Sequence, residues 1–347
     1  MSQTRKKRAD KGTVASAQNP NLQTGSGRGK WAGIIIAAVV IAIMAATIGF
    51  FSYQQYIAPF RRPVVVVDDV SIRMDYFLTR LRLSGADPLD MLNQLSREQV
   101  IKLVAPQYGI EVTPEDIDQT LRTTFRGESE TISESEFNEW YRQLLNERGL
   151  SDAEFRELVS IGLLSSRLQE YLAERVPTVA PQRHLYIIAL EEYEEALEVR
   201  ARWEAGENFS ELAREVSVDE STREQGGELG WFPPGGVLAP NLEFEAFSLN
   251  TGNVSQPIAL MGEEVTPEGE TVPAIMGYYI TLVAEEAVRE LDEASLQVVR
   301  GNALDDWFSK ERGSHKIQYH GFKNGFDSET YAWINWQLAK SQPSSSG

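Results

Sequence analysis

The chain has 347 residues, with 33 Lys and Arg against 51 Asp and Glu, and no cysteine. This length corresponds to about two domains. The net charge of −18 argues against a nucleic-acid partner, because phosphates would be repelled over most of the surface. The missing thiols exclude disulfides, thiolate zinc sites, iron–sulfur clusters and cysteine nucleophiles.

The N-terminal part of the chain predicts a membrane anchor. Residues 1–30 carry seven basic groups and one acid, and the following 21 residues, Trp31 to Phe51, carry no charge. About 20 apolar helical residues span the hydrocarbon core of a bilayer. The alternatives are a buried core helix, which rarely lacks a polar face over such a length, and a cleaved signal peptide, which has a shorter apolar region and a small-x-small site. We therefore expect an uncleaved transmembrane anchor at 31–52.

The distribution of charge predicts the orientation of this anchor. Basic residues hold their side of a span in the cytoplasm, so residues 1–30 are expected to be a cytoplasmic tail, with the bulk of the chain outside the cytoplasm. The charge is split in the same way, since residues 1–62 carry a net +8 and residues 63–347 a net −26. The sequence thus predicts a single-pass protein of the cell membrane, with the lipid bilayer as the partner of residues 31–52.

Residues 63–180 are predicted to be mostly helical. They begin with a short hairpin over 64–67 and 70–72, with two acids at its turn. Signals for the start of a helix follow at Thr113, Ser133 and Ser151, and the last two have the spacing of a capping box. This pattern favours a helical domain, with residues 177–181 as a linker at its end.

Residues 181–288 predict a compact α+β domain. Strands and helices are expected in the order β-α-α-β-α-β-β, at residues 184–190, 191–206, 209–216, 226–232, 238–249, 254–260 and 277–288. One long helix is expected within 289–312. An aromatic-rich extension with a flexible serine-rich end follows at 313–347, and packing is the simplest interpretation of its aromatic residues.

Six short motifs stand in a fixed order in the α+β segment. They are Arg183-His184, Phe209…Ser217-Val218-Asp219, Gly226-Gly227-Glu228-Leu229-Gly230-Trp231-Phe232, Glu243…Phe247-Ser248-Leu249, Gly252-Asn253-Val254-Ser255-Gln256-Pro257 and Gly277-Tyr278-Tyr279-Ile280. In this order and at this spacing, residues 182–285 resemble a parvulin, a member of the rotamase family of peptidyl-prolyl cis-trans isomerases.

The flanks of this segment carry a second resemblance. Residues 67–72, 108–118 and 150–156 resemble the helical N-terminal domain of exported foldases of the SurA and PrsA type. In those proteins a helical chaperone domain is assembled from segments on both sides of the parvulin domain. The resemblance therefore implies an α+β protein with a helical chaperone domain at 63–180, a parvulin domain inserted at 181–288, and a helix at 289–312 that returns to the helical domain.

Isomerisation of an X–Pro bond breaks no covalent bond, so no nucleophile, metal or cofactor is expected. The barrier of about 18–20 kcal/mol comes from amide resonance. A catalyst lowers it by seating the proline in an apolar pocket, excluding water and stabilising the twisted amide. Parvulins share a pair of histidines, an acid or thiol between them, and an apolar proline cup. The resemblance assigns these roles to His184 as the first histidine, Asp219 as the acid, and Leu238, Leu242 and Phe247 as the cup.

Each of these residues also has a structural interpretation, and the sequence leaves both open. His184 suits a strand, Asp219 suits a loop cap, and the apolar side chains suit a core. The chain departs from the family at Tyr279, where the second histidine is expected, and at Met276, where a small hydroxyl residue is expected. A tyrosine still donates a hydrogen bond, but its ordinary pKa of about 10 removes it from proton exchange near neutrality. An acidic insertion at 261–274 is expected to be a lid or an inert loop.

These features together predict a membrane-anchored extracytoplasmic foldase, which isomerises and chaperones exported polypeptides. The alternative is a catalytically degenerate parvulin that acts as a holdase chaperone or as a scaffold at the export site. The expected partners are unfolded or proline-containing exported polypeptides, and export machinery is a further candidate. Acids at Glu191, Glu192, Glu194 and Glu195 argue against phosphopeptide clients and favour neutral or basic segments.

Overall fold

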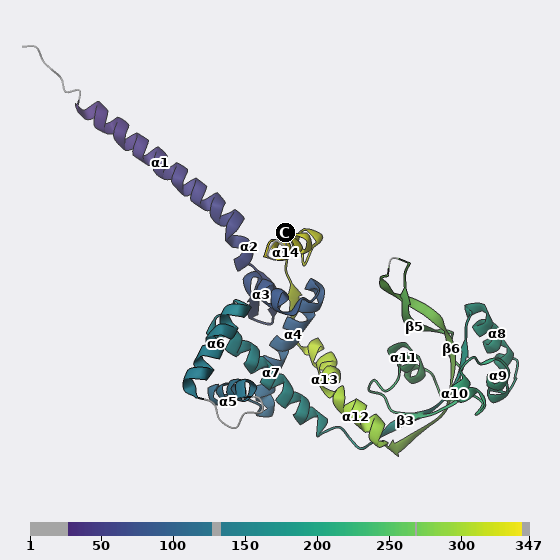
Figure 1. Cartoon of the computed structure of the whole chain (residues 1–347). Helices are drawn as coiled ribbons and strands as arrows, with labels where there is room; N and C mark the ends of the chain where they lie inside the picture. The colour runs from purple at the N-terminus through teal and green to yellow at the C-terminus, as the bar shows by residue number, and fades with distance from the viewer. Residues whose placement is uncertain (1–26, 127–132, 268, 342–347) are drawn as a thin grey trace, which may run out of the picture. The chain divides into compact units, whose positions relative to one another are not determined.

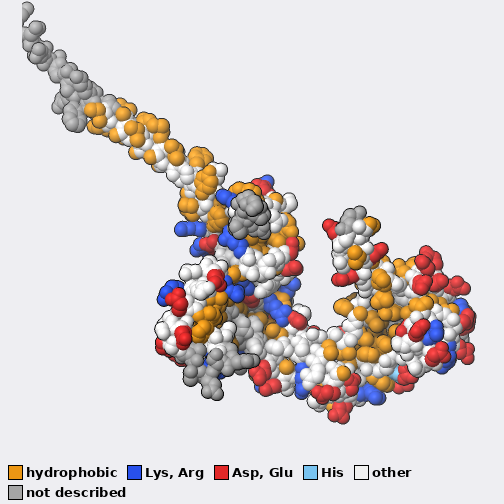
Figure 2. Space-filling model, viewed as in Figure 1, with side chains coloured by type: hydrophobic (Ala, Val, Ile, Leu, Met, Phe, Trp, Pro, Cys, Tyr) orange, Lys and Arg blue, Asp and Glu red, His pale blue; other side chains and the backbone are white. Residues whose placement is uncertain are grey.

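The computed structural model describes residues 27–126, 133–267 and 269–341, and it divides into two compact units, residues 1–62 and 63–347 (Figure 1). The first unit holds helix α1 (Gly27–Tyr56) and the short helix α2 (Ala58–Arg61). Within α1, Ile34–Tyr56 is long and apolar enough to cross a membrane by length and composition, with a mean hydropathy of 2.8. Figure 2 shows the hydrophobic side chains that cover this helix. Residues 1–26 of the tail predicted at 1–30 lie outside the described residues.

The second unit begins with the predicted hairpin, formed by β1 (Pro63–Val67) and β2 (Val70–Arg73). Its tight turn places Asp68 at a φ of 52°. Strand β7 (Ile317–Tyr319), from the C-terminal extension, pairs with the other side of β1. Among the described residues this gives a three-stranded antiparallel sheet in the order β2-β1-β7.

Helices follow the hairpin, as the sequence predicts. They are α3 (Met74–Ser84), α4 (Pro88–Val104), α5 (Pro114–Arg126), α6 (Glu134–Arg148) and α7 (Asp152–Ala173), with a 3-10 turn, η1, at Ala105–Tyr108. Both predicted capping boxes form, because Ser133 and Ser151 each exchange hydrogen bonds with the glutamate three residues later. These helices surround a core with fully buried side chains such as Phe77, Met91 and Leu168.

The C-terminal extension packs against this helical region. Helix α14 (Ser328–Ser341) buries Ile334 completely. The ring of Phe326 meets that of Phe77 edge-on at 6.2 Å, and the Tyr331 hydroxyl donates to the Asp87 carboxylate at 2.7 Å. Phe326 and Tyr331 are therefore used for packing, whereas Trp336 is 55% exposed. The serine-rich end at 342–347 lies outside the described residues.

The α+β class and the predicted element order are confirmed for the remaining segment, with one short helix added. Its elements are β3 (Val179–Leu190), α8 (Tyr193–Glu204), α9 (Phe209–Val216), α10 (Glu220–Arg223), β4 (Glu228–Phe232), α11 (Pro240–Ser248), β5 (Ile258–Val265) and β6 (Thr271–Glu290). The strands form an antiparallel sheet in the order β4-β3-β6-β5. Helices α8 and α9 pack on one face around Ile188 and Ile280, and α11 packs on the other face around Leu185 and Val283.

Three expectations about local structure were wrong. The expected linker at 177–181 already contains the start of β3, because Val179 pairs with Glu290. The insertion at 261–274 is a hairpin arm, not a loop, since pairing of β5 with β6 continues to Val265 and Thr271. The long helix expected within 289–312 is divided into α12 (Glu293–Gly301) and α13 (Ala303–Glu311), followed by a 3-10 turn, η2, at Arg312–Ser314. The break comes at Asn302, which precedes the first residue of α13 and whose side-chain amide donates a hydrogen bond to the Gly235 carbonyl.

Candidate functional site

Tyr279 lies in the middle of the second sheet. It is directly opposite Ala189 of β3 and Ile258 of β5. Its neighbour Tyr278 packs against Tyr193 on the α8 face, with ring centroids 5.3 Å apart. Because side chains alternate along a strand, Tyr279 projects on the opposite face, which α11 covers.

The segment before α10 is bound to the same place on β3. The Ala189 N–H donates to the Ser217 hydroxyl at 3.1 Å, and the Val218 N–H donates to the Ala189 carbonyl at 2.9 Å. Asp219 is thereby brought close to Tyr279. Burial, together with the charge of Asp219, raises the pKa of Tyr279 above its ordinary value. The phenol therefore stays protonated at neutral pH and is available as a hydrogen-bond donor.

The Asp219 carboxylate is itself engaged as a helix cap. It accepts hydrogen bonds from the Ser221 N–H at 3.1 Å, the Ser221 hydroxyl at 2.7 Å and the Thr222 hydroxyl at 2.5 Å. Partial burial raises the pKa of Asp219, but these hydrogen bonds outweigh burial and lower it overall. The carboxylate is thus ionised at neutral pH, and it holds the loop that faces Tyr279.

Helix α11 brings Leu242 to this end of the sheet. The side-chain amide of its neighbour Asn241 donates to the Ala259 carbonyl, one residue from Ile258. Leu242 is 5% exposed. Asp219, Tyr279 and Leu242 therefore share one end of the α11 face, where an apolar surface adjoins a phenol donor.

His184 is not part of this group. Its ring stacks on that of Trp231 at 4.9 Å and its Nε2 lies 2.9 Å from the Glu228 carboxylate. On β6 it pairs with Glu285, five positions along β3 from the Tyr279 pair, a distance of about 16 Å along a strand. The ring also contacts Tyr186, which packs on the α8 face. The expected pairing of His184 with Tyr279 is therefore wrong, because the alternation of the strand sends His184 to the other face.

The other predicted substrate-binding residues lie away from Tyr279. Leu238 and Phe247 pack against the buried cluster of Leu185 and Val283, which is the structural interpretation of these side chains. Met276 is 58% exposed and lies over Gly262 on the β5–β6 hairpin arm. Of the expected cup, only Leu242 lies at the same end of the face as Tyr279.

Sequence reasoning missed the residues that frame this group, which are Ala189, Ser217 and Ile258. A usable signal was present in the strand 184–190, because period-two alternation separates His184 from Leu185, Ile187 and Ala189. The register against β6 is set by long-range pairing with a bulge after His184, and no local pattern reports it.

A cavity of about 550 Å³ between α8 and α9, on the face of the sheet opposite Tyr279, is strongly acidic. Its apolar wall is formed by Leu190, Val199, Val216 and Val218. The remaining residues that line it are charged, namely Glu191, Glu195, Glu198, Arg202 and Glu215. Arg202 is already paired with Glu207 and Glu215, both at 2.8 Å. Figure 2 shows acidic side chains gathered over α8 and α9. Within the described ranges, no group of three or more His, Asp and Glu side chains is placed to hold a metal ion.

Comparison with known families matches the helices of this segment and part of its sheet. Residues 189–268 match the family model of the rotamase, or PPIC-type PPIase, domain. The match begins after His184 and ends before Tyr279. The recognition of a parvulin-type domain is therefore confirmed.

Comparison with whole proteins points in the same direction. The foldase protein PrsA of Oceanobacillus iheyensis is 31% identical over 181 residues, which cover 49% of this chain and 56% of that protein. The PrsA of Halalkalibacterium halodurans is 28% identical over 235 residues, covering 61% and 65%. The chain thus matches less than two thirds of the length of these relatives. A crystal structure of the peptidylprolyl isomerase PrsA from Bacillus anthracis matches 72% of this chain and 96% of that chain at 20% identity, with a TM-score of 0.32.

Proposed function

We propose that this chain, which carries a parvulin-type rotamase domain and resembles the PrsA foldases, is an extracytoplasmic foldase that isomerises X–Pro bonds and chaperones unfolded polypeptides. The match of residues 189–268 to the rotamase domain carries this proposal. The sequence similarity to two PrsA foldases covers 181 and 235 residues and so extends beyond that domain, which supports the chaperone part.

The proposed catalytic group is the end of the α11 face. A proline ring lies against Leu242 and Ile258, which remove water from it. The Tyr279 hydroxyl donates a hydrogen bond to the substrate amide as it twists and loses its resonance. Asp219 acts as a positioning residue, because its carboxylate is already occupied by Ser221 and Thr222. No covalent bond forms or breaks, so no proton has to be transferred.

The proposed location is the outer side of a membrane, with α1 as a single-pass anchor and the basic N-terminus in the cytoplasm. Supporting this are the apolar length of Ile34–Tyr56 and the seven basic groups of residues 1–30. The acidic cavity between α8 and α9 favours clients with neutral or basic segments. The bilayer and components of the export machinery are further proposed partners.

Isomerisation of a short proline peptide by the full chain in detergent micelles tests the catalytic proposal. We expect Tyr279→Phe to lower kcat/KM about tenfold, which corresponds to the loss of one hydrogen bond of about 1.4 kcal/mol. His184→Ala is the matched control, and it should stay within about twofold because its ring lies on the other face. A wild-type rate equal to the uncatalysed rate, or a loss confined to His184→Ala, would contradict the proposal.

One observation favours a second candidate, a holdase without turnover. None of the three histidines lies beside Tyr279, since His315 binds Asp68 at 2.7 Å and the main chain of His320 binds Val64 at 2.8 Å, both in the first sheet. Suppression of client aggregation that survives Tyr279→Phe and Asp219→Ala together, in a chain without measurable isomerisation, would select this candidate.

A further inference from the structure

Strand β2 forms a free edge of the first sheet. It pairs with β1 alone, while β1 is also paired with β7. Two hydrogen bonds show which main-chain groups of β1 point towards β7. The Asp68 N–H donates to the Lys316 carbonyl, and the Val64 carbonyl accepts from the His320 N–H. Even-numbered residues of β1, including Val66, therefore face β7.

Ser71 of β2 consequently has main-chain groups that point outwards. It lies opposite Val66, whose N–H and C=O face β7, so this pair exchanges no ladder bonds. Among residues 27–126, 133–267 and 269–341, no other segment forms a backbone hydrogen bond with Ser71. The residue itself is exposed. Such a donor and acceptor on a strand edge are the elements that an extended chain requires for pairing.

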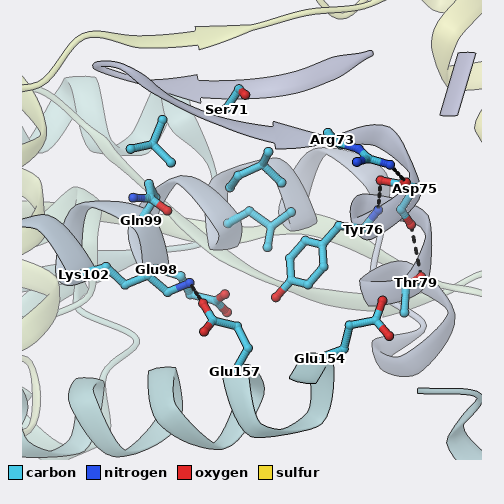
Figure 3. A pocket seen from close by; sticks show the side chains of 13 residues that line it. Ser71, Arg73, Asp75, Tyr76, Thr79, Glu98, Gln99, Lys102, Glu154 and Glu157 are labelled. Atoms are coloured by element: carbon cyan, nitrogen blue, oxygen red, sulfur yellow. Dashed lines mark hydrogen bonds and ion pairs between the residues drawn. The ribbon is translucent and has the colours of Figure 1, made fainter. Parts of the chain in front are cut away.

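A cavity of about 520 Å³ adjoins this edge. All four residues of β2 line it, which places the opening at the edge of the strand, because side chains of a strand alternate between its two faces. In Figure 3 the cavity lies between β2 and α7, with α3 and α4 at its sides. We call this cavity the β2 groove.

The β2 groove combines an apolar floor with an acidic rim. Ile72, Tyr76 and Leu95 supply the apolar surface. Four carboxylates and two cations also line it, namely Asp75, Glu98, Glu154, Glu157, Arg73 and Lys102. Most of its charges are paired, since Lys102 contacts Glu157, Arg73 contacts Asp75 and Arg80 contacts Glu98. The surplus negative charge is that of Glu154, which accepts hydrogen bonds from Ser151.

We propose that the β2 groove binds an extended segment of an unfolded polypeptide, which pairs with Ser71 as an added strand. Only a main chain in the extended conformation matches an outward N–H and C=O on a strand edge, and alternate side chains of such a segment enter the groove. The acidic rim favours segments that are neutral or basic. This proposal rests on the proposed function in that the segment belongs to a client, but the site is separate from Tyr279.

The first experiment separates main-chain pairing from side-chain contacts. The probe is a fluorescent seven-residue peptide of alternating Val and Thr, with Lys at both ends and no proline, titrated by anisotropy into the full chain in micelles. A second peptide of the same sequence carries N-methyl groups on three consecutive central residues. These groups remove the main-chain N–H donors and leave the side chains unchanged. We expect the methylated peptide to bind at least tenfold more weakly, and a Glu-ended version to bind more weakly than the Lys-ended one.

The second experiment removes the donor from the protein. Ser71→Pro eliminates the outward N–H and fits an edge position, since no ladder bond to β1 is lost. Ser71→Ala is the matched control. We expect Ser71→Pro to weaken peptide binding about tenfold and Ser71→Ala to leave it unchanged, with equal melting temperatures and equal isomerisation of a short proline peptide in both variants.

Three outcomes would overturn the proposal. The first is equal binding of the methylated and the plain peptide. The second is equal peptide binding by Ser71→Pro and Ser71→Ala. The third is a wild type that binds no peptide but forms a concentration-dependent dimer, which Ser71→Pro abolishes. The last outcome would assign the edge to a second copy of the chain. Because the probe lacks proline, failure of isomerisation leaves this test intact, and failure of this test leaves isomerisation intact.

Discussion

The buried ion pair between Arg80 and Glu98 provides a demanding test of the helical region. The two side chains are 8% and 14% exposed, and they form two parallel hydrogen bonds of 2.6 and 2.7 Å. The Tyr76 hydroxyl accepts a further bond from Arg80 at 3.2 Å. Burial by itself lowers the pKa of Arg80, but the bonds from Glu98 and Tyr76 outweigh it and raise the pKa overall, so the guanidinium stays charged.

Glu98→Ala would leave that guanidinium buried without a counter-charge. Removal of one partner of a buried pair costs about 3–5 kcal/mol, whereas replacement of both by apolar residues of similar volume is close to neutral. We therefore expect Glu98→Ala to lower the free energy of unfolding by about 3–5 kcal/mol, and the double variant Arg80→Met, Glu98→Leu to recover most of that loss.

Urea unfolding followed by circular dichroism measures this, together with amide hydrogen exchange of α3 and α4 to localise the effect. The matched control is Glu139→Ala, which breaks the exposed pair with Arg142 (side chains 71% and 66% exposed) and should change stability by less than about 1 kcal/mol. A loss below about 1 kcal/mol for Glu98→Ala, or a double variant as unstable as the single one, would refute the reasoning.

Three further outcomes are expected. Asp219→Asn should lower the urea midpoint at pH 7. The pKa of Asp219 is lowered in the folded chain, so the stability advantage of the wild type is complete above the ordinary Asp pKa of about 4 and should shrink as the pH falls below it. A stability difference that does not vary with pH would contradict the capping role. Gly227→Ala should destabilise the fold strongly, because Gly227 has a φ of 82° and a Cβ there would collide with the Ile187 carbonyl oxygen. The control in calorimetry is Gly252→Ala, since Gly252 has a similar φ of 84° but open space around it. Equal losses of stability in the two variants would disprove the steric cause. Ser151→Ala should cost about 1 kcal/mol through loss of the capping box, and Ser160→Ala, inside the same helix, should cost less in the same urea experiment.

Local signals in the sequence predicted local structure well. Ser133 and Ser151 start helices because a cap and its glutamate lie three residues apart, and both partners are visible in the sequence. The hairpin of β1 and β2 was predictable for the same reason, since β-branched residues flank a two-residue turn. In each case the interacting groups are neighbours along the chain.

The candidate site depends on pairing between distant segments, and there the sequence was less informative. Tyr279 and Asp219 come together through the register of β3 against β6 and through two hydrogen bonds at Ala189. His184 lies five positions before Ala189 on β3, so the alternation of side chains directs a histidine in a suitable motif to the other face. The insertion at 261–274 was misjudged for a related reason: it was expected to be a lid or an inert loop, while pairing between its two arms makes most of it a hairpin.

The pairing of β7 with β1 has a consequence for the order in which the chain folds. In a chain that is exported while its basic N-terminus stays in the cytoplasm, β1 follows the anchor and emerges early, whereas β7 emerges much later. All strands of the second sheet lie within 179–290, so that sheet is complete while β1 still lacks its second neighbour. Contacts of such high sequence separation form late. Until β7 arrives, the protein therefore exposes a second open strand edge, at which another chain can pair and aggregation can begin.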